Sequence, residues 1–91
     1  MGKYARMRLR YLKEHRPALY TSLLFSGKLD EHLSEIEVSA QAMMESITNR
    51  LKQERGITEE LKANDQMRWV QQMNVIHEAT LETIINDLIY A

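Results

Sequence analysis

Residues 29–56 read LDEHLSEIEVSAQAMMESITNRLKQERG, and they carry the clearest structural pattern of the chain. Its apolar side chains recur at steps of three and four, which on an α-helix places them within an arc of about 100°. They are Leu29, Leu33, Ile36, Ala40, Met43, Met44, Ile47 and Leu51. The spacing predicts one helix with a single apolar face, roughly 40 Å long at a rise of 1.5 Å per residue. Gly56 is expected to end it after Lys52 and Arg55, whose charges are favourable at the negative end of a helix.

A second long helix is predicted after this glycine. Thr58 is a good N-cap, and Glu59 and Glu60 follow in the first turn, where acidic residues are favoured. Asn64-Asp65 indicates either a kink or a fresh N-cap. The apolar residues beyond it cover about half of the helix circumference, which is wider than packing against a single neighbouring helix requires. They are Trp69, Val70, Met73, Ile76, Leu81, Ile84, Ile85 and Leu88. We therefore expect an antiparallel hairpin turning at Gly56-Ile57, with the N-terminal helices covering the other side of its second arm.

The N-terminal residues predict two shorter helices. Pro17 disfavours helix at Arg16 but suits the first turn of a new helix, and Ser26-Gly27 closes that apolar segment. The sequence thus predicts an all-α fold, a small bundle of about four helices within a single domain, residues 1–91. We expect a basic helix in residues 1–16, a short apolar helix in 17–27, a long amphipathic helix in 28–56 and a long C-terminal helix in 57–91.

Composition excludes several classes of protein. The chain has 91 residues, so it has room for one small domain. It has no cysteine, which rules out a disulfide framework and thiolate zinc sites and fits a cytoplasmic location. No apolar run reaches the eighteen or so residues that span a bilayer, and basic residues interrupt any signal-peptide core. We expect no membrane association.

Charge is unevenly distributed although the formal net charge is only −1. Residues 1–16 contain six basic residues and one acid, a balance of +5, and residues 17–91 contain six basic residues and twelve acids, a balance of −6. On a helix Lys3, Arg6, Arg10 and Lys13 fall within about 80° of one another; we call them the cationic stripe. The adjoining face carries Tyr4, Met7 and Tyr11.

The cationic stripe is spaced to meet successive phosphates of a nucleic acid, and its four residues are the candidate nucleic-acid-binding residues. The alternative is that it pairs within the fold with Glu35, Glu59 or Glu82.

No pattern in the sequence indicates catalysis or metal binding. The three histidines, His15, His32 and His77, fall on different predicted helices and lack the Glu-x-x-His spacing of di-iron bundles. Serine-nucleophile and zinc-protease motifs are absent, and the three glycines stand apart as helix ends. We predict a protein that is not an enzyme and has no metal site, cofactor or small-molecule ligand.

A helix-turn-helix reading centred on Gly27 is disfavoured. It would place Ser22 and Ser26 where that motif buries apolar side chains. The would-be recognition helix would also begin with Asp30 and Glu31, carboxylates that repel phosphates.

Several runs of residues resemble transposon-encoded proteins of the TnpV type. They are residues 10–17 (RYLKEHRP) followed by Leu19-Tyr20, residues 23–29 (LLFSGKL), His32-Leu33-x-Glu35-Ile36, residues 56–62 (GITEELK), Gln66-Met67-x-Trp69-Val70 and residues 88–90 (LIY). The resemblance covers nearly the whole chain. It implies a bacterial cytoplasmic protein of a mobile genetic element that also encodes a recombinase. It brings no catalytic or ligand residues.

Two functions are consistent with these observations. The first is an accessory or regulatory factor that binds DNA weakly through the cationic stripe during excision or recombination. The second is a protein-binding adaptor or inhibitor whose acidic helices engage a larger nucleic-acid-processing enzyme, as a mimic of nucleic acid. A homodimer formed through the apolar face of the hairpin also stays open.

Overall fold

The computed structural model describes all 91 residues and consists of helices without any strand. The elements are α1 (Lys3–His15), α2 (Pro17–Ser26), α3 (Leu29–Arg55), α4 (Glu59–Asn64), α5 (Gln66–Ile84) and η1 (Ile85–Ile89), the last a π-helical turn that continues α5. The predicted all-α fold is confirmed. None of the helices combines the length and the hydropathy that crossing a bilayer demands.

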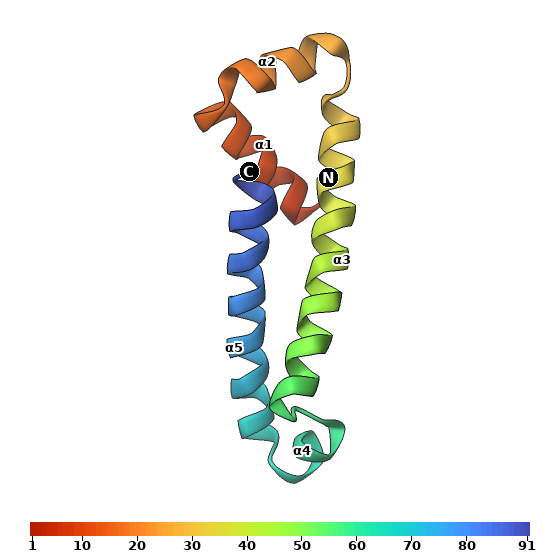
Figure 1. Cartoon of the computed structure of the whole chain (residues 1–91), viewed down its shortest axis with the longest axis vertical. Coiled ribbons are helices and arrows are strands. Elements are labelled where there is room, and N and C mark those ends of the chain that lie inside the picture. The colour runs from red at the N-terminus through yellow and green to blue at the C-terminus, as the bar shows by residue number, and fades with distance from the viewer.

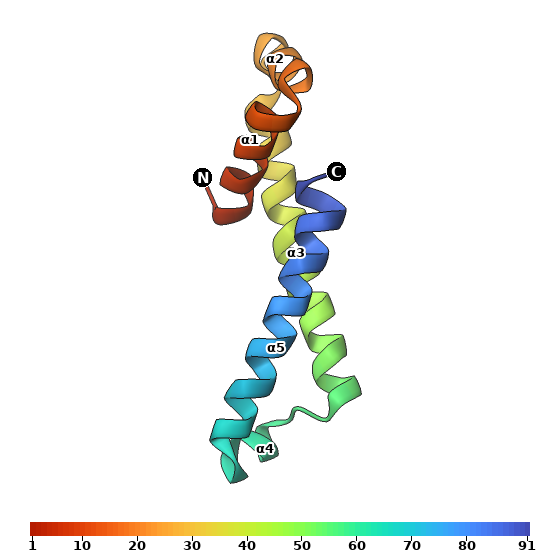
Figure 2. The ribbon, with the colours of Figure 1, turned by 90° about the vertical axis from the view of Figure 1, so that its left-hand side faces the viewer.

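The molecule is a narrow rod of 55 × 19 × 19 Å. The long helices α3 and α5 run side by side in opposite directions, with α4 at one end of the rod and α2 at the other (Figure 1). Figure 2 shows that α3 and α5 cross near the middle of the rod. Helix α1 lies against the end of this pair that carries the C-terminus.

The core is small and divided along the rod. One cluster joins α1, α3 and the end of α5, and is formed by Tyr4, Ile36, Ala40, Ile84 and Ile89. A second cluster near α4 is formed by Ile57, Met73 and Ile76. Only 14 of the 91 residues are buried, so each buried contact carries a large share of the stability.

Glycines and side-chain caps set the ends of the helices. Gly27 and Gly56 adopt the left-handed conformation, with φ of 74° and 66°, and end α2 and α3 as expected. The Thr58 hydroxyl accepts a hydrogen bond from the Leu61 N–H at 3.2 Å and caps α4. The Asp65 carboxylate accepts one from the Arg68 N–H at 3.2 Å and caps α5.

The long C-terminal helix expected in residues 57–91 is not continuous, because α4 ends at Asn64 and α5 begins at Gln66. Of the two readings of Asn64-Asp65, the fresh N-cap is the correct one. Asp65 has a non-helical backbone (φ −149°, ψ 78°) that breaks the helix, and its side chain accepts a hydrogen bond from an N–H of the next helix. A short helix therefore separates α3 from α5, where a tight turn was expected.

The expected position of the N-terminal helices is also wrong. Helix α1 packs across α3 and reaches only the last turn of α5 and η1, while α2 packs on α1 and α3. The second neighbour of α5 is α4. Val70, one of the residues of the predicted apolar arc, consequently stays 40% exposed, so the width of that arc overestimated how much of α5 is covered.

Candidate nucleic-acid interface on the first helix

The N-terminus of α1 is capped by a carboxylate from another helix. Gly2 supplies no side chain to cap α1, and no acid lies in its first turn. Glu37 of α3 takes this role, because its Oε1 accepts a hydrogen bond from the Ala5 N–H at 3.0 Å, while its Oε2 accepts one from the Gln41 amide at 2.9 Å. A Cβ added at Gly2 would overlap the Glu37 carboxylate, so glycine makes room for this cap.

The environment of Glu37 favours its charged form. Partial burial alone would raise its pKa. The hydrogen bonds from Ala5, Gln41 and Tyr4, together with the positive charge of Arg6, outweigh burial and lower the pKa below its usual value. The carboxylate is therefore ionised at neutral pH and complements the positive end of the helix dipole.

Arg8 hydrogen-bonds the middle of α1 to the C-terminal residues of the chain. Its side chain is buried, and Nη1 donates to the main-chain oxygens of Ile89 and Ala91 at 2.7 and 2.8 Å. Its Nε donates to Nε2 of His32 on α3 at 3.2 Å. One guanidinium thus connects α1, α3 and the end of the chain.

Because Arg8 is a donor only, Nε2 of His32 must be unprotonated to accept its hydrogen bond. Burial and the neighbouring Arg8 charge both lower the pKa of His32, while Glu35 opposes them. Burial also lowers the pKa of Arg8, against a smaller opposing influence of Tyr11.

Sequence reasoning missed this role of Arg8. The signal was the four-residue spacing from Tyr4 to Arg8 to Leu12, which places Arg8 on the buried face of α1.

The Glu37 cap and the Arg8 hydrogen bonds fix α1 with its cationic stripe toward solvent. Lys3, Arg6, Arg10 and Lys13 are all exposed, on the side of α1 opposite its buried residues. Two contacts within 4.0 Å join basic and acidic side chains, the Arg50–Glu54 ion pair and the contact between His15 and Glu14, and neither involves the stripe. Pairing of the stripe with Glu35, Glu59 or Glu82 does not occur.

The stripe has weaker contacts with its surroundings. Lys3 and Lys13 lie 5.4 and 5.6 Å from the ring centres of Tyr4 and Tyr20, distances at which cation–π attraction operates. These contacts orient the ammonium groups, and both lysines stay exposed.

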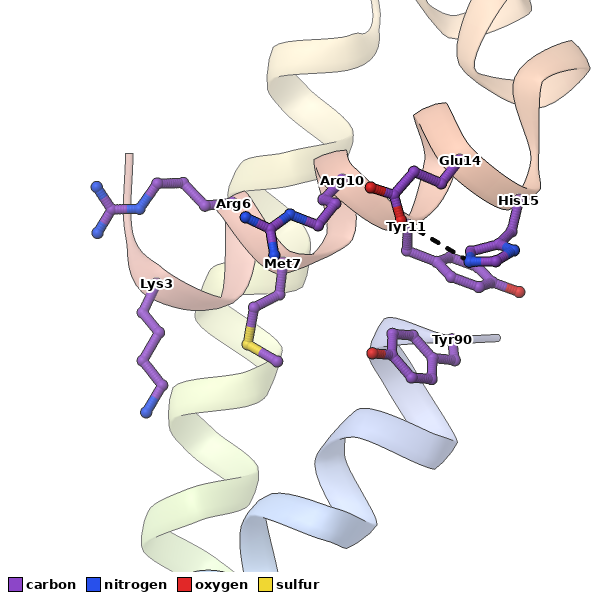
Figure 3. Close-up of a pocket in the computed structure, with 8 residues that line it drawn as sticks. All are labelled: Lys3, Arg6, Met7, Arg10, Tyr11, Glu14, His15 and Tyr90. Carbon is purple, nitrogen blue, oxygen red and sulfur yellow. Dashed lines mark ion pairs between the residues drawn. The ribbon is translucent and has the colours of Figure 1, made fainter.

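A groove of about 740 Å³ opens beside the stripe (Figure 3). Seven residues of α1 and one from the C-terminal end line it: Lys3, Arg6, Met7, Arg10, Tyr11, Glu14, His15 and Tyr90. A smaller hollow of about 260 Å³ on the other side of the stripe is lined by Arg6, Leu9, Arg10, Lys13 and Glu14. Arg6 and Arg10 border both hollows.

Aromatic rings stack at the end of this groove that lies near the last turn of α1. The Tyr11 and Tyr90 rings lie 4.9 Å apart, centre to centre, at 27° between their planes, and the His15 ring lies 5.3 Å from Tyr11. The sequence placed Tyr11 beside the stripe but did not indicate Tyr90, because docking of η1 onto α1 brings the two together.

The histidines do not gather into a metal site. His32 is engaged with Arg8, His15 is exposed beside Glu14, and His77 is exposed on α5. No group of three or more His, Cys, Asp or Glu side chains is arranged to hold a metal ion.

Comparison with known proteins gives one match. The model of the family described as transposon-encoded protein TnpV covers residues 1–89 of the 91-residue chain. No curated protein and no solved structure matches this chain. Because the match spans nearly the entire sequence, this chain belongs to the TnpV family of transposon-encoded proteins.

Proposed function

We propose that this chain is a DNA-binding accessory or regulatory protein of a bacterial mobile genetic element, acting in the cytoplasm without catalysing a reaction. The observation that supports DNA binding is the cationic stripe, four exposed cations on one face of α1 that form no ion pair with the chain's own carboxylates. Membership of a transposon-encoded family fits a role in excision or recombination.

The anchoring of α1 strengthens this proposal. Glu37 holds the first turn and Arg8 holds the middle, so the helix presents its cations from a fixed backbone. Lys3 and Lys13 are ten residues apart in sequence, roughly 15 Å along the helix, a span that covers several phosphates of a DNA strand. Contacts of this kind position a protein without reading sequence, so we expect weak and sequence-independent affinity.

The experiment is a salt titration of binding to a labelled DNA duplex. Four phosphate contacts correspond to a slope of about −3.6 in log K against log[salt], so affinity should fall roughly 150-fold between about 50 and about 200 mM salt. Arg6→Gln and Arg10→Gln should each reduce the slope by about one. The matched control is Arg68→Gln, an exposed arginine on α5, which should leave the slope unchanged. Absence of duplex binding at the lower salt would overturn the proposal.

A second candidate function is supported by the acidic surfaces of α3 and α5. Glu31, Glu35, Glu45, Glu78 and Glu82 are exposed and form no ion pair within 4.0 Å. Such a surface can enter the basic channel of a nucleic-acid-processing enzyme. If the duplex does not bind and the chain instead competes with DNA for the recombinase of its own element, with Glu78→Gln/Glu82→Gln weakening that competition, the adaptor or inhibitor function is favoured.

A further inference from the structure

The groove beside α1 combines two kinds of side chain that act on different parts of a nucleic acid. Lys3, Arg6 and Arg10 carry positive charge, whereas Tyr11 and Tyr90 offer aromatic rings at the opposite end (Figure 3). Phosphates bind cations, and bases stack on aromatic rings. Its volume of about 740 Å³ falls within the range of about 300–1,000 Å³ found for ligand sites.

Tyr90 is the ring of the stack that is open to a ligand. It is 51% exposed, and its ring contact with Tyr11 uses only part of its surface. Tyr11 is half-buried and contacts both His15 and Tyr90. A planar base placed against Tyr90 would extend a column of rings that the fold already holds together.

The charge of the groove favours an anionic ligand. It contains three cationic side chains, Lys3, Arg6 and Arg10, and one acid, Glu14, whose carboxylate lies 3.9 Å from His15. The Met7 side chain projects into the space between the cations and the rings (Figure 3) and adds apolar contact surface.

These observations point to single-stranded DNA. In a duplex the faces of the bases are stacked and hidden, so a duplex can use the cations but not the rings. An unpaired strand exposes both its phosphates and the π-faces of its bases. We infer that the groove between α1 and the C-terminal end binds unpaired DNA, with phosphates on Lys3, Arg6 and Arg10 and a base stacked on Tyr90. The charge part of this inference rests on the proposed function, and the stacking part does not.

The test compares an oligo-dT strand of about twelve nucleotides with a duplex of equal length, by fluorescence anisotropy. Tyr90→Ala should weaken binding of the strand about 5- to 150-fold, the range that corresponds to stacking of one base. Duplex affinity and the salt slope should not change. Tyr90→Phe retains the ring and should restore binding. Phe25→Ala is the matched control, because Phe25 is an aromatic residue 85% exposed on α2, outside the groove.

A second measurement needs no variant. An abasic strand of the same length retains its phosphates but lacks bases, so the wild-type chain should bind it about as weakly as Tyr90→Ala binds oligo-dT. Equal affinity of the wild-type chain for the abasic strand and for oligo-dT would overturn the inference, as would unchanged oligo-dT binding by Tyr90→Ala. Duplex binding with the expected salt slope alongside either result would leave the proposed function intact. If the strand binds in a way that depends on the Tyr90 ring but the duplex does not bind, the inference about the groove is supported and the proposed duplex binding is not.

Discussion

Replacing Arg8 by alanine removes a buried guanidinium that hydrogen-bonds α1 to α3 and to the end of the chain. The hydrogen bond from Arg8 Nη1 to the Ile89 oxygen is buried and charge-assisted. One hydrogen bond of this kind contributes about 1.5–3 kcal/mol to the free energy of unfolding. The bonds to Ala91 and His32 are only partly buried, so water replaces them at lower cost. We expect a loss of about 2–4 kcal/mol of unfolding free energy.

Against a total of roughly 5–14 kcal/mol for a domain of this size, this loss is large enough to measure by urea unfolding. With an m-value of about 1 kcal/mol per molar urea, the midpoint should fall by roughly 2 M or more. A variant that is already partly unfolded in the absence of urea would show the same effect more strongly.

Arg10→Ala is the matched control, because Arg10 is the same residue type two positions further along α1 but exposed and free of ion pairs. It should change the unfolding free energy by less than about 0.5 kcal/mol and lower the salt slope of duplex binding by about one. Equal stability of Arg8→Ala and Arg10→Ala would refute the reasoning that Arg8 is a structural anchor.

Three further predictions concern other parts of this framework. The pKa of His32 is lower in the folded chain than the ordinary 6.5, so the unfolded state is protonated first and stability should be lost as pH falls below about 6.5. Between about pH 7.5 and 5 the urea midpoint of the wild type should fall more than that of His32→Gln, whose side chain can still accept a hydrogen bond from Arg8. Parallel falls of the two midpoints would contradict this prediction. Gly2→Ala should displace the Glu37 cap and cost about 1 kcal/mol in thermal or urea unfolding. The effect should shrink in a Glu37→Ala background, which has no carboxylate to displace; full additivity would show that the two residues act separately. Asp65→Ala should cost about 1 kcal/mol by loss of the α5 cap, with duplex binding unchanged, and an unaltered urea midpoint would mean that the cap does not stabilise the break between α4 and α5.

Local signals in the sequence explain most of the helix boundaries. The periodicity of residues 29–56 and the glycine at its end correctly predicted α3, because an apolar stripe and a left-handed cap depend on neighbours along the chain. Asn64-Asp65 left two readings open. A side chain that bonds the backbone ahead of it favours a cap over a continuous helix, and that is the reading the structure takes.

The parts of the candidate site that sequence reasoning missed depend on contacts between distant residues. Arg8 contacts Ile89 across 81 positions and His32 across 24. A basic residue on an apolar helix face does not reveal which main-chain oxygens will satisfy it. The cationic stripe was identified because its spacing is local, whereas Tyr90 entered the groove only through the docking of η1 onto α1.

By itself, the order of residues determined that this chain is helical, where its longest helix ends, and that four cations share one side of its first helix. Each of these properties follows from the α-helical repeat and from capping, which operate within a few residues. Three other properties appear only in the folded chain: Glu37 caps α1, Arg8 is turned inward, and Tyr90 lines one groove together with the cations. These arrangements require the helices to be packed, because packing determines which polar groups lose water and must find partners within the chain.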